Sequence, residues 1–264
     1  MSLPLSGATR VHFIVGDPIA QVKSPGDVTA AFARHGRDAI VAPAHVRPAD
    51  LTAWFQGVSL AGNVVGIIVT VPHKFACRPL CQTVSERAAF LGAVNTIRRN
   101  RDGSWHGDMF DGLGYVAALR DRGCDPAGRR ALLVGAGGAG SAIAHALVMA
   151  GVESLAIHDG DPRRQGSLVE RLAALGRCPV TAGTADPAGH DLVINASPAG
   201  MRDGDPLPVE VARLEPGCFV GCVITAPAIS PLIAAARDRG LATATGSDMF
   251  VRVRDLMVEF LLNR

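Results

Sequence analysis

The chain has 264 residues, of which 48% are hydrophobic and 19% charged, so it can build the core of one large domain or two ordinary ones and is not disordered. A net charge of +2 without a long run of lysine or arginine excludes a typical nucleic-acid-binding protein. The apolar runs are too short for a membrane span, and MSLPLSGATR has no signal-peptide pattern, so we expect a cytoplasmic protein without a membrane partner.

Strands and helices alternate in the first hundred residues and end in a hairpin. The predicted elements are a strand at 11–16, a helix, a strand at 39–46, a helix at 49–60, a buried strand from 66, short helices in KFACRPL and SERAAFLG, and a hairpin of AVNTIRR with SWHGD. The first helix has Ser24 as its predicted N-cap and Pro25 as its first helical residue. In GIIVTVPHKF, residues 66–75, Lys74 closes a buried strand, and by itself this pattern is typical of a surface cation.

The pattern of alternation resumes after Asp111 and continues to the end of the chain. The predicted elements are a helix at 112–123, a strand, glycine turn and helix at 131–151, a strand at 154–159, a helix in PRRQGSLVERLAALG, strand ends at 191–201 and 218–225, a helix at 230–240 and a long helix at 247–262. Alternation of this kind predicts an α/β protein with parallel sheets. We place the domain boundary near residues 107–112, with 1–107 and 247–264 in one domain and 108–246 in the other.

The cysteines do not indicate a metal site. No two of them form a C-x-x-C pair, and no cluster of histidine or aspartate completes a zinc site. We therefore predict reduced thiols and no bound metal. The six are Cys77, Cys81, Cys124, Cys178, Cys218 and Cys222.

A glycine-rich loop, Gly135-x-Gly137-x-x-Gly140, follows the strand ALLV and opens a helix. Gly135 permits a sharp turn, Gly137 lets backbone approach a pyrophosphate, and Gly140 lets the helix approach the strand. The free N–H groups of the helix N-terminus favour phosphate. The sequence therefore predicts a dinucleotide site, in which Ala136, Gly138 and Ala139 complete the loop.

An acid at the end of the next strand bears on the choice of dinucleotide. Asp159 lies nineteen residues beyond Gly140, where a carboxylate binds the adenosine ribose hydroxyls of NAD and repels the extra phosphate of NADP. Arg163 and Arg164 follow and offer charge to such a phosphate, or else form the exposed first turn of a helix. We expect NAD rather than NADP.

Several motifs together resemble the shikimate dehydrogenase family and its quinate/shikimate relatives. The resemblance runs from residue 16 to about 251 through GDPIAQVKSP, GIIVTVPHK, GAVNT, GDMFDG, GAGGAG, NASPAGM and SDMF. It implies an N-terminal α/β substrate domain, a C-terminal Rossmann domain, a last helix that returns to the first domain, and an active site in the cleft between the domains. It also implies oxidation of a ring hydroxyl with hydride transfer to a nicotinamide.

The resemblance assigns residues to this chemistry. It implies that Lys74 and Asp111 share the proton transfer, and without it we would interpret Asp111 as a helix N-cap. The other positions that match the family's binding residues are Ser24, Thr70 and Asn95 on the substrate, and Asn195, Ser197, Met201, Val223 and Gly246 beside the nicotinamide.

This chain departs from the family pattern at several polar positions. Val22, Ile68, Thr225 and Val253 stand where the family has serine, asparagine, tyrosine and glutamine, and Met109-Phe110 replaces Asn-Thr before Asp111. A buried polar group without a partner costs on the order of 1–3 kcal/mol. If these residues line the pocket, the preferred substrate is a cyclic hydroxy acid with fewer hydroxyls than shikimate or with an apolar face; if the alignment slips locally, they are core.

The family's NADP-binding segment NRT-x-x-R is DGDPRR here, where Asp159 and Gly160 replace an asparagine and an arginine and Arg164 remains. This departure favours NAD. Two functions stay open: a dehydrogenase of shikimate-like acids, as a monomer or homodimer, or a catalytically weak, NAD-binding regulatory protein on the same fold. A methylenetetrahydrofolate-type dehydrogenase is disfavoured by the order of the motifs.

Overall fold

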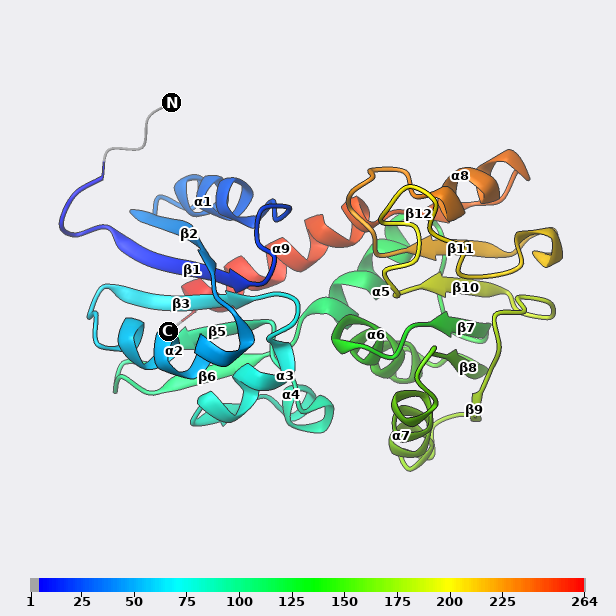
Figure 1. Ribbon diagram of the computed structural model, residues 1–264, viewed down its shortest axis with the longest axis horizontal. Coiled ribbons are helices and arrows are strands. Elements are labelled where there is room, and N and C mark those ends of the chain that lie inside the picture. Colours follow the sequence, from blue (N-terminus) through cyan, green and yellow to red (C-terminus); the bar gives the residue numbers. More distant parts are fainter. Residues whose placement is uncertain (1–4, 264) are drawn as a thin grey trace. The chain divides into compact units, whose positions relative to one another are not determined.

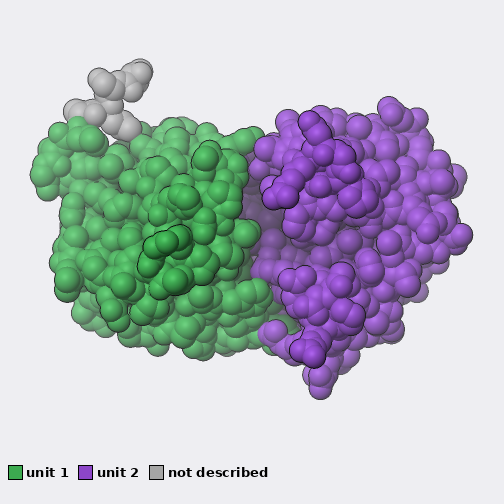
Figure 2. Space-filling model, viewed as in Figure 1, with its two compact units in different colours: residues 1–110, 254–264 green, residues 111–253 purple. Residues whose placement is uncertain are grey.

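In the computed structural model, which describes residues 5–263, the chain divides into two compact units (Figure 2). Unit 1 runs to Phe110 and resumes at Arg254, and unit 2 spans Asp111–Val253. The sequence placed the two divisions at 107/108 and 246/247. In the structure the second division falls after Val253, inside the last helix, so the first half of this helix belongs to unit 2. Residues 1–4 and 264, which were included in the predicted first domain, lie outside the described residues.

Unit 1 is built on a six-stranded sheet of order β2-β1-β3-β5-β6-β4 (Figure 1). Its elements are β1 (Arg10–Gly16), α1 (Ser24–Arg34), β2 (Ala39–His45), α2 (Leu51–Ser59), β3 (Val64–Val69), α3 (Lys74–Cys77), β4 (Thr83–Val84), α4 (Glu86–Leu91), β5 (Thr96–Arg99) and β6 (Trp105–Asp108), with 3-10 turns at Pro48–Asp50 and Arg78–Leu80. The sheet is mixed, because β5 runs antiparallel to both β3 and β6. The predicted hairpin is confirmed as β5–β6, whereas an all-parallel sheet is not found here.

Two local predictions in unit 1 are wrong. Lys23, not Ser24, is the N-cap of α1; its side chain makes no capping hydrogen bond, and Ser24 is the buried first helical residue. Strand β3 ends at Val69, so Lys74 does not close the strand. It begins the four-residue helix α3 after a turn in which His73 N–H donates to the carbonyl oxygen of Thr70.

Unit 2 is built on a six-stranded, fully parallel sheet of order β12-β11-β10-β7-β8-β9. Its elements are α5 (Asp111–Asp121), β7 (Arg130–Val134), α6 (Gly138–Met149), β8 (Ser154–His158), α7 (Pro162–Ala173), β9 (Val180–Ala182), β10 (Leu192–Asn195), a 3-10 turn (Val211–Arg213), β11 (Phe219–Cys222), α8 (Pro231–Asp238), β12 (Thr243–Ala244) and α9 (Gly246–Leu262), whose last part belongs to unit 1. This strand order is that of doubly wound Rossmann folds, and the direction in which strands are added to the sheet reverses between β7 and β10.

The core of unit 2 explains why its strands are continuous apolar runs. Leu132, Val193 and Val220 lie on three neighbouring strands, are fully buried, and pack in one cluster with Leu232 and Ile233 of α8. A sheet buried on both faces needs such runs, since water reaches neither side. Ligands of doubly wound sheets bind at the carboxyl ends of the strands where the order reverses, which here are the ends of β7 and β10.

Candidate functional site

The glycine loop occupies the carboxyl end of β7, and its three glycines have three different environments. Gly135 has φ +107°, and a Cβ there would lie 2.7 Å from the peptide between Ala196 and Ser197. A Cβ on Gly140 would collide with the carbonyl oxygen of Gly135, so the helix packs on bare backbone. A Cβ on Gly137, the N-cap of α6, would meet nothing within 4 Å. The loop thus leaves open backbone at a helix N-terminus, as a pyrophosphate requires.

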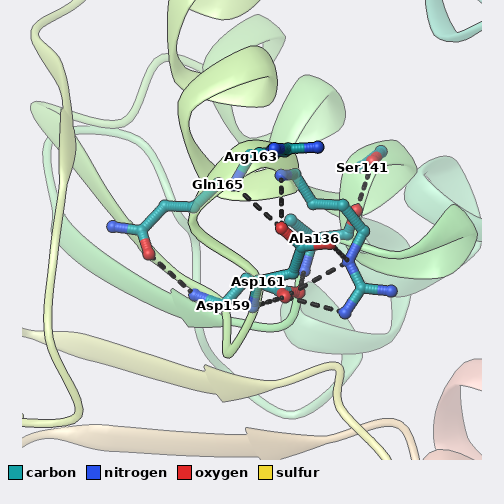
Figure 3. Close-up of polar contacts among 7 residues, drawn as sticks. Ala136, Ser141, Asp159, Asp161, Arg163 and Gln165 are labelled. Carbon is teal, nitrogen blue, oxygen red and sulfur yellow. Dashed lines mark hydrogen bonds and ion pairs between the residues drawn. The ribbon is translucent and has the colours of Figure 1, made fainter.

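Asp159, directly after β8, ties the glycine loop to the next strand (Figure 3). Its side chain is 6% exposed; Oδ2 accepts the Ala136 N–H at 2.6 Å, and Oδ1 accepts the Asp161 N–H at 2.8 Å. Arg164, 60% exposed, donates from Nη2 to the same Oδ1 at 2.9 Å. Burial raises the pKa of Asp159, but these donors outweigh it and hold the pKa below its ordinary value. Asp159 is therefore an anion that both shapes the loop and faces Arg164.

Gln165 belongs to the same network, although no sequence pattern pointed to it. Its Oε1 accepts the N–H of Asp159 at 3.2 Å, and its Nε2 donates to the carbonyl oxygen of Gly183 at 3.2 Å, just after β9. One amide thus links Asp159, at the end of β8, to the residue that follows β9. A glutamine in a helix's first turn has no local pattern that reveals such a role.

The loop after β10 is held by Asn195, which is fully buried. Its Oδ1 accepts from the N–H and hydroxyl of Ser197 at 3.0 and 2.6 Å, and its Nδ2 donates to the carbonyl oxygen of Ala199 at 3.1 Å. The carbonyl oxygen of Asn195 accepts the Val223 N–H at 3.0 Å, and a Cβ on Gly246 would collide with the carbonyl oxygen of Val223. Four predicted residues therefore gather around this loop.

Met201 is 48% exposed, further along the same loop. Thr225 is half-buried beyond β11, and Val253 is buried in α9. A Cβ on Gly114 of α5 would overlap Val253, so the valine side chain fills a helix crossing. Its apolar character has a packing reason within unit 2.

Unit 1 brings Thr70, Lys74 and Asn95 together through backbone contacts. Thr70 follows β3, and the N–H of Val69 beside it donates to the carbonyl oxygen of Asn95 at 2.7 Å. The N–H of Val94 donates to the carbonyl oxygen of Lys74 at 2.9 Å. Lys74 is half-buried and Asn95 is 2% exposed.

His73, to which the sequence assigned no role, anchors the turn before Lys74. It is 1% exposed, and its Nε2 donates to the carbonyl oxygen of Val46 at 2.7 Å. Because a carbonyl only accepts, Nε2 carries a proton. This contact joins the Lys74 turn to the end of β2.

The remaining predicted residues lie near the first helix, inside the sheet of unit 1 or at the start of α5. Ser24 is 5% exposed at the start of α1, and Val22 is half-buried in the loop before it. Ile68, 3% exposed, lies inside β3 between Ile14 and Thr96 of the neighbouring strands. Asp111, 5% exposed, is the first residue of α5 in unit 2, where a helix N-terminus favours a carboxylate.

Comparisons with known proteins identify the family of this chain. The sequence-family model named shikimate dehydrogenase substrate binding domain matches residues 14–97. A protein named shikimate dehydrogenase (NADP(+)) from Rubrobacter xylanophilus is 40% identical over 95% of this chain and 90% of its own length. The chain belongs to the shikimate dehydrogenase family. The predicted family, fold class and enzyme class are thereby confirmed.

Two solved structures of this family extend the comparison. Shikimate 5-dehydrogenase from Listeria monocytogenes, in complex with shikimate and NAD, is 26% identical, covers all of this chain and 95% of its own, and has a TM-score of 0.90. Quinate dehydrogenase from Corynebacterium glutamicum, in complex with NAD, is 28% identical over 97% of this chain and 94% of its own, with a TM-score of 0.88. None of the helices in residues 5–263 combines the length and apolar character of a membrane span.

Proposed function

We propose that this protein is an NAD(P)-dependent oxidoreductase that interconverts a ring hydroxyl and a ketone of shikimate or a related cyclic hydroxy acid. The observation that carries the proposal is the glycine loop at the β7–β10 reversal, open at Gly137 and linked to Asp159, in a chain of this family. Unit 2 then holds the dinucleotide and unit 1 the substrate. The alternative, a catalytically weak, NAD-binding regulatory protein, is not favoured, because the relative from Rubrobacter xylanophilus is named as a dehydrogenase.

The bound dinucleotide supplies the hydride acceptor or donor. Around it, the chain's own groups would bind and orient: N–H groups at the start of α6 would hold the phosphates, and the loop fixed by Asn195, with Ser197, Val223 and Gly246, would hold the nicotinamide. On the substrate side, Thr70 and Asn95 bind ring hydroxyls and Ser24 binds the carboxylate. Met201 is assigned to the cofactor side and Thr225 to the substrate side.

Lys74 and Asp111 share the proton transfer in this proposal. In the oxidising direction one of them accepts the hydroxyl proton as hydride leaves the ring carbon, and the other orients the acceptor. Their supporting observations are the low exposure of both residues and the placement of Lys74 beside Thr70 and Asn95.

The test of this role follows the absorbance of reduced nicotinamide with shikimate and quinate as substrates. Lys74→Ala and Asp111→Asn should each lower kcat by about 10²–10⁴-fold, as loss of a general acid or base does. The chain contains one other lysine, the exposed Lys23, so Lys23→Ala is a matched control that should keep kcat within about twofold. Unchanged kcat in Lys74→Ala would remove the proposed role.

We further propose a preference for NAD over NADP, although the curated relative is named for NADP(+). The support is Asp159, an anion held in place by two backbone N–H groups. The 2′-phosphate of NADP adds about −1.5 to −2 charges and would be repelled there. Arg164 already donates to Asp159, so part of its charge is offset by that carboxylate before any phosphate binds.

Asp159→Asn tests this preference because it keeps an oxygen acceptor for Ala136 and removes the charge. The ratio of kcat/KM with NADP to kcat/KM with NAD should rise by about tenfold or more, which is about 1.4 kcal/mol. Asp161→Asn makes the same charge change two positions further on and should leave the ratio within about twofold. A wild-type chain that prefers NADP, with no change in Asp159→Asn, would contradict the proposal.

The substrate is, in our proposal, less hydroxylated than shikimate or apolar on one face. Val22 supports this best, because it is half-buried at a position where the family has a serine. Ile68 and Val253 have packing roles in their own units and add no support. Wild type should therefore prefer quinate-like or deoxygenated acids to shikimate in kcat/KM.

Val22→Ser tests the role of this position. A restored hydrogen bond to a charged group contributes about 1.5–3 kcal/mol, so kcat/KM for shikimate should rise at least tenfold. Leu60→Ser, at a side chain that is 88% exposed, controls for a general effect of removing apolar surface. Efficient turnover of shikimate by wild type at micromolar KM would refute the substrate proposal and leave the dehydrogenase itself intact.

A further inference from the structure

An ion pair between half-buried Arg87 and buried Asp108 in unit 1 holds the last residues before Asp111. Asp108, whose side chain is 7% exposed, accepts from Arg87 Nη2 on Oδ2 at 2.5 Å. Its Oδ1 accepts from the Ser85 hydroxyl and, at 2.7 Å, from the N–H of Met109. Ser85 is also the N-cap of α4 and accepts the Ala88 N–H at 3.2 Å. The start of α4 and the end of β6 are thereby joined through one carboxylate.

Phe110 is fixed by three further contacts. Its ring lies under the Arg87 guanidinium, with 5.0 Å from Cζ to the ring centroid, and meets the edge of Phe260 at a centroid distance of 5.3 Å. Its N–H donates to Oδ1 of Asn95 at 3.0 Å, and the same oxygen accepts the Thr96 hydroxyl at 3.0 Å. Arg87 thus contacts both Asp108 and Phe110, and every backbone N–H between Asp108 and Asp111 donates to a side chain.

We infer that Arg87 is a positioning residue for Asp111, which acts by fixing Asp108 and Phe110. This inference rests on the proposed role of Asp111 in proton transfer. Asp111 follows Phe110 directly, so a shift of the Phe110 backbone moves the Asp111 Cα with it. A displacement of about 1 Å at a reacting group costs on the order of 10²-fold in rate. The sequence patterns gave no sign of Arg87, because its partners lie 21 and 23 residues away.

The two contacts of Arg87, to Asp108 and to Phe110, can be removed separately by substitution. Its planar guanidinium forms an ion pair and stacks on a ring at once, whereas a lysine ammonium keeps the ion pair without the planar stack. Removing the cation leaves the buried Asp108 carboxylate without its ion-pair partner, and we expect Asp108 to turn toward water. Arg87→Met should therefore release Met109 and Phe110, and Arg87→Lys should release Phe110 alone.

The experiment is a double-mutant cycle on the full chain. Arg87→Met is made in wild type and in Asp111→Asn, and kcat is measured at saturating substrate, with high enzyme concentration for the Asp111→Asn pair. We expect kcat to fall about tenfold or more in wild type, with KM for the dinucleotide within about twofold, and no further fall in Asp111→Asn. Arg87→Lys should give a smaller loss of kcat than Arg87→Met.

Arg99→Met is the matched control. Arg99 also stacks on a ring in unit 1, with 5.5 Å from Cζ to the Trp105 centroid, and donates to the carbonyl oxygen of Ala61 at 3.0 Å. It should lower stability and keep kcat within about twofold. If Arg87→Met does not fold, Asp108→Asn takes its place in the cycle, since it keeps the acceptor for Met109 and removes the ion pair.

The outcomes separate the two claims. Near-wild-type kcat in Asp111→Asn means that the proposed role of Asp111 fails, and the positioning role falls with it. A large loss in Asp111→Asn, together with the same fold-loss from Arg87→Met in both backgrounds, means that Arg87 acts through general structure, and the inference is overturned. Loss in wild type alone supports it.

Discussion

Gly135 and Gly137 lie two residues apart in one loop, yet alanine at each should have opposite effects. At Gly137 the added methyl meets nothing within 4 Å, and φ −75° with ψ −169° is open to any residue. The only cost is a poorer N-cap, about 0.5–1 kcal/mol. At Gly135, φ +107° is strained for alanine by about 1–3 kcal/mol, and the methyl also presses on the Ala196–Ser197 peptide.

Binding should show the reverse order of effects. The methyl of Gly137→Ala occupies the open backbone that faces the pyrophosphate, so the Kd for NAD should rise tenfold or more, about 1.4 kcal/mol. Gly135→Ala should lower the Tm by about 5 °C or more, since about 2 kcal/mol shifts a unit of this size by that amount. Titration calorimetry measures the Kd, and circular dichroism follows the Tm of both variants beside wild type.

Either of two results would refute this reasoning. If Gly137→Ala binds NAD and NADP as tightly as wild type, the loop is not the pyrophosphate site. If Gly135→Ala melts at the wild-type temperature, the turn does not need the left-handed conformation. A Gly137→Ala variant that lost both NAD affinity and thermal stability would show that the open space at this position is filled in solution.

Three further predictions follow from individual groups. Asp191, paired with Arg130, has its pKa lowered to about 2 chiefly by hydrogen bonds from that arginine, so its stabilisation is complete above the ordinary pKa of 3.8 and is lost as pH falls toward 2. Asp191→Asn should therefore lower the free energy of unfolding at neutral pH by about 1 kcal/mol after solvent screening, and the difference from wild type should vanish in acid urea titrations. Tyr115→Phe removes a buried hydroxyl without a hydrogen-bond partner among the described residues, so urea denaturation should show unchanged or higher stability, and a loss above about 1 kcal/mol would reveal a hidden partner. A thiol reagent should label half-buried Cys178 before Cys77, whose pKa burial raises to about 12, as mass spectrometry of the native protein can check.

Local patterns predicted the parts of the site that depend on backbone conformation. The spacing of Gly135, Gly137 and Gly140 reflects a turn, an open approach and a close packing, each of which is a property of a few adjacent residues. The position of Asp159 after its strand follows from strand length. These features are readable because each is fixed by its own neighbours along the chain.

The parts that the sequence could not predict depend on distant partners. The antiparallel pairing of β5 with β3 joins segments thirty residues apart, and no propensity encodes it. The end of β3 at Val69 was missed because Val71 continues the apolar run beyond the last paired residue. Ser24 has the chemistry of a cap, but Lys23 already has helical dihedral angles of −95° and −19°, so the serine is drawn into the helix.

The helix that starts with Asp111 has almost no freedom to adapt. A Cβ on Gly112 would collide with the Ala142 carbonyl of α6, and a Cβ on Gly114 would overlap Val253 of α9, so α5 is clamped by bare backbone on two sides. Any heavier side chain at these two places would push the whole helix aside. Since Asp111 is the first residue of α5, a substitution at Gly112 or Gly114 would carry its carboxylate away with the helix.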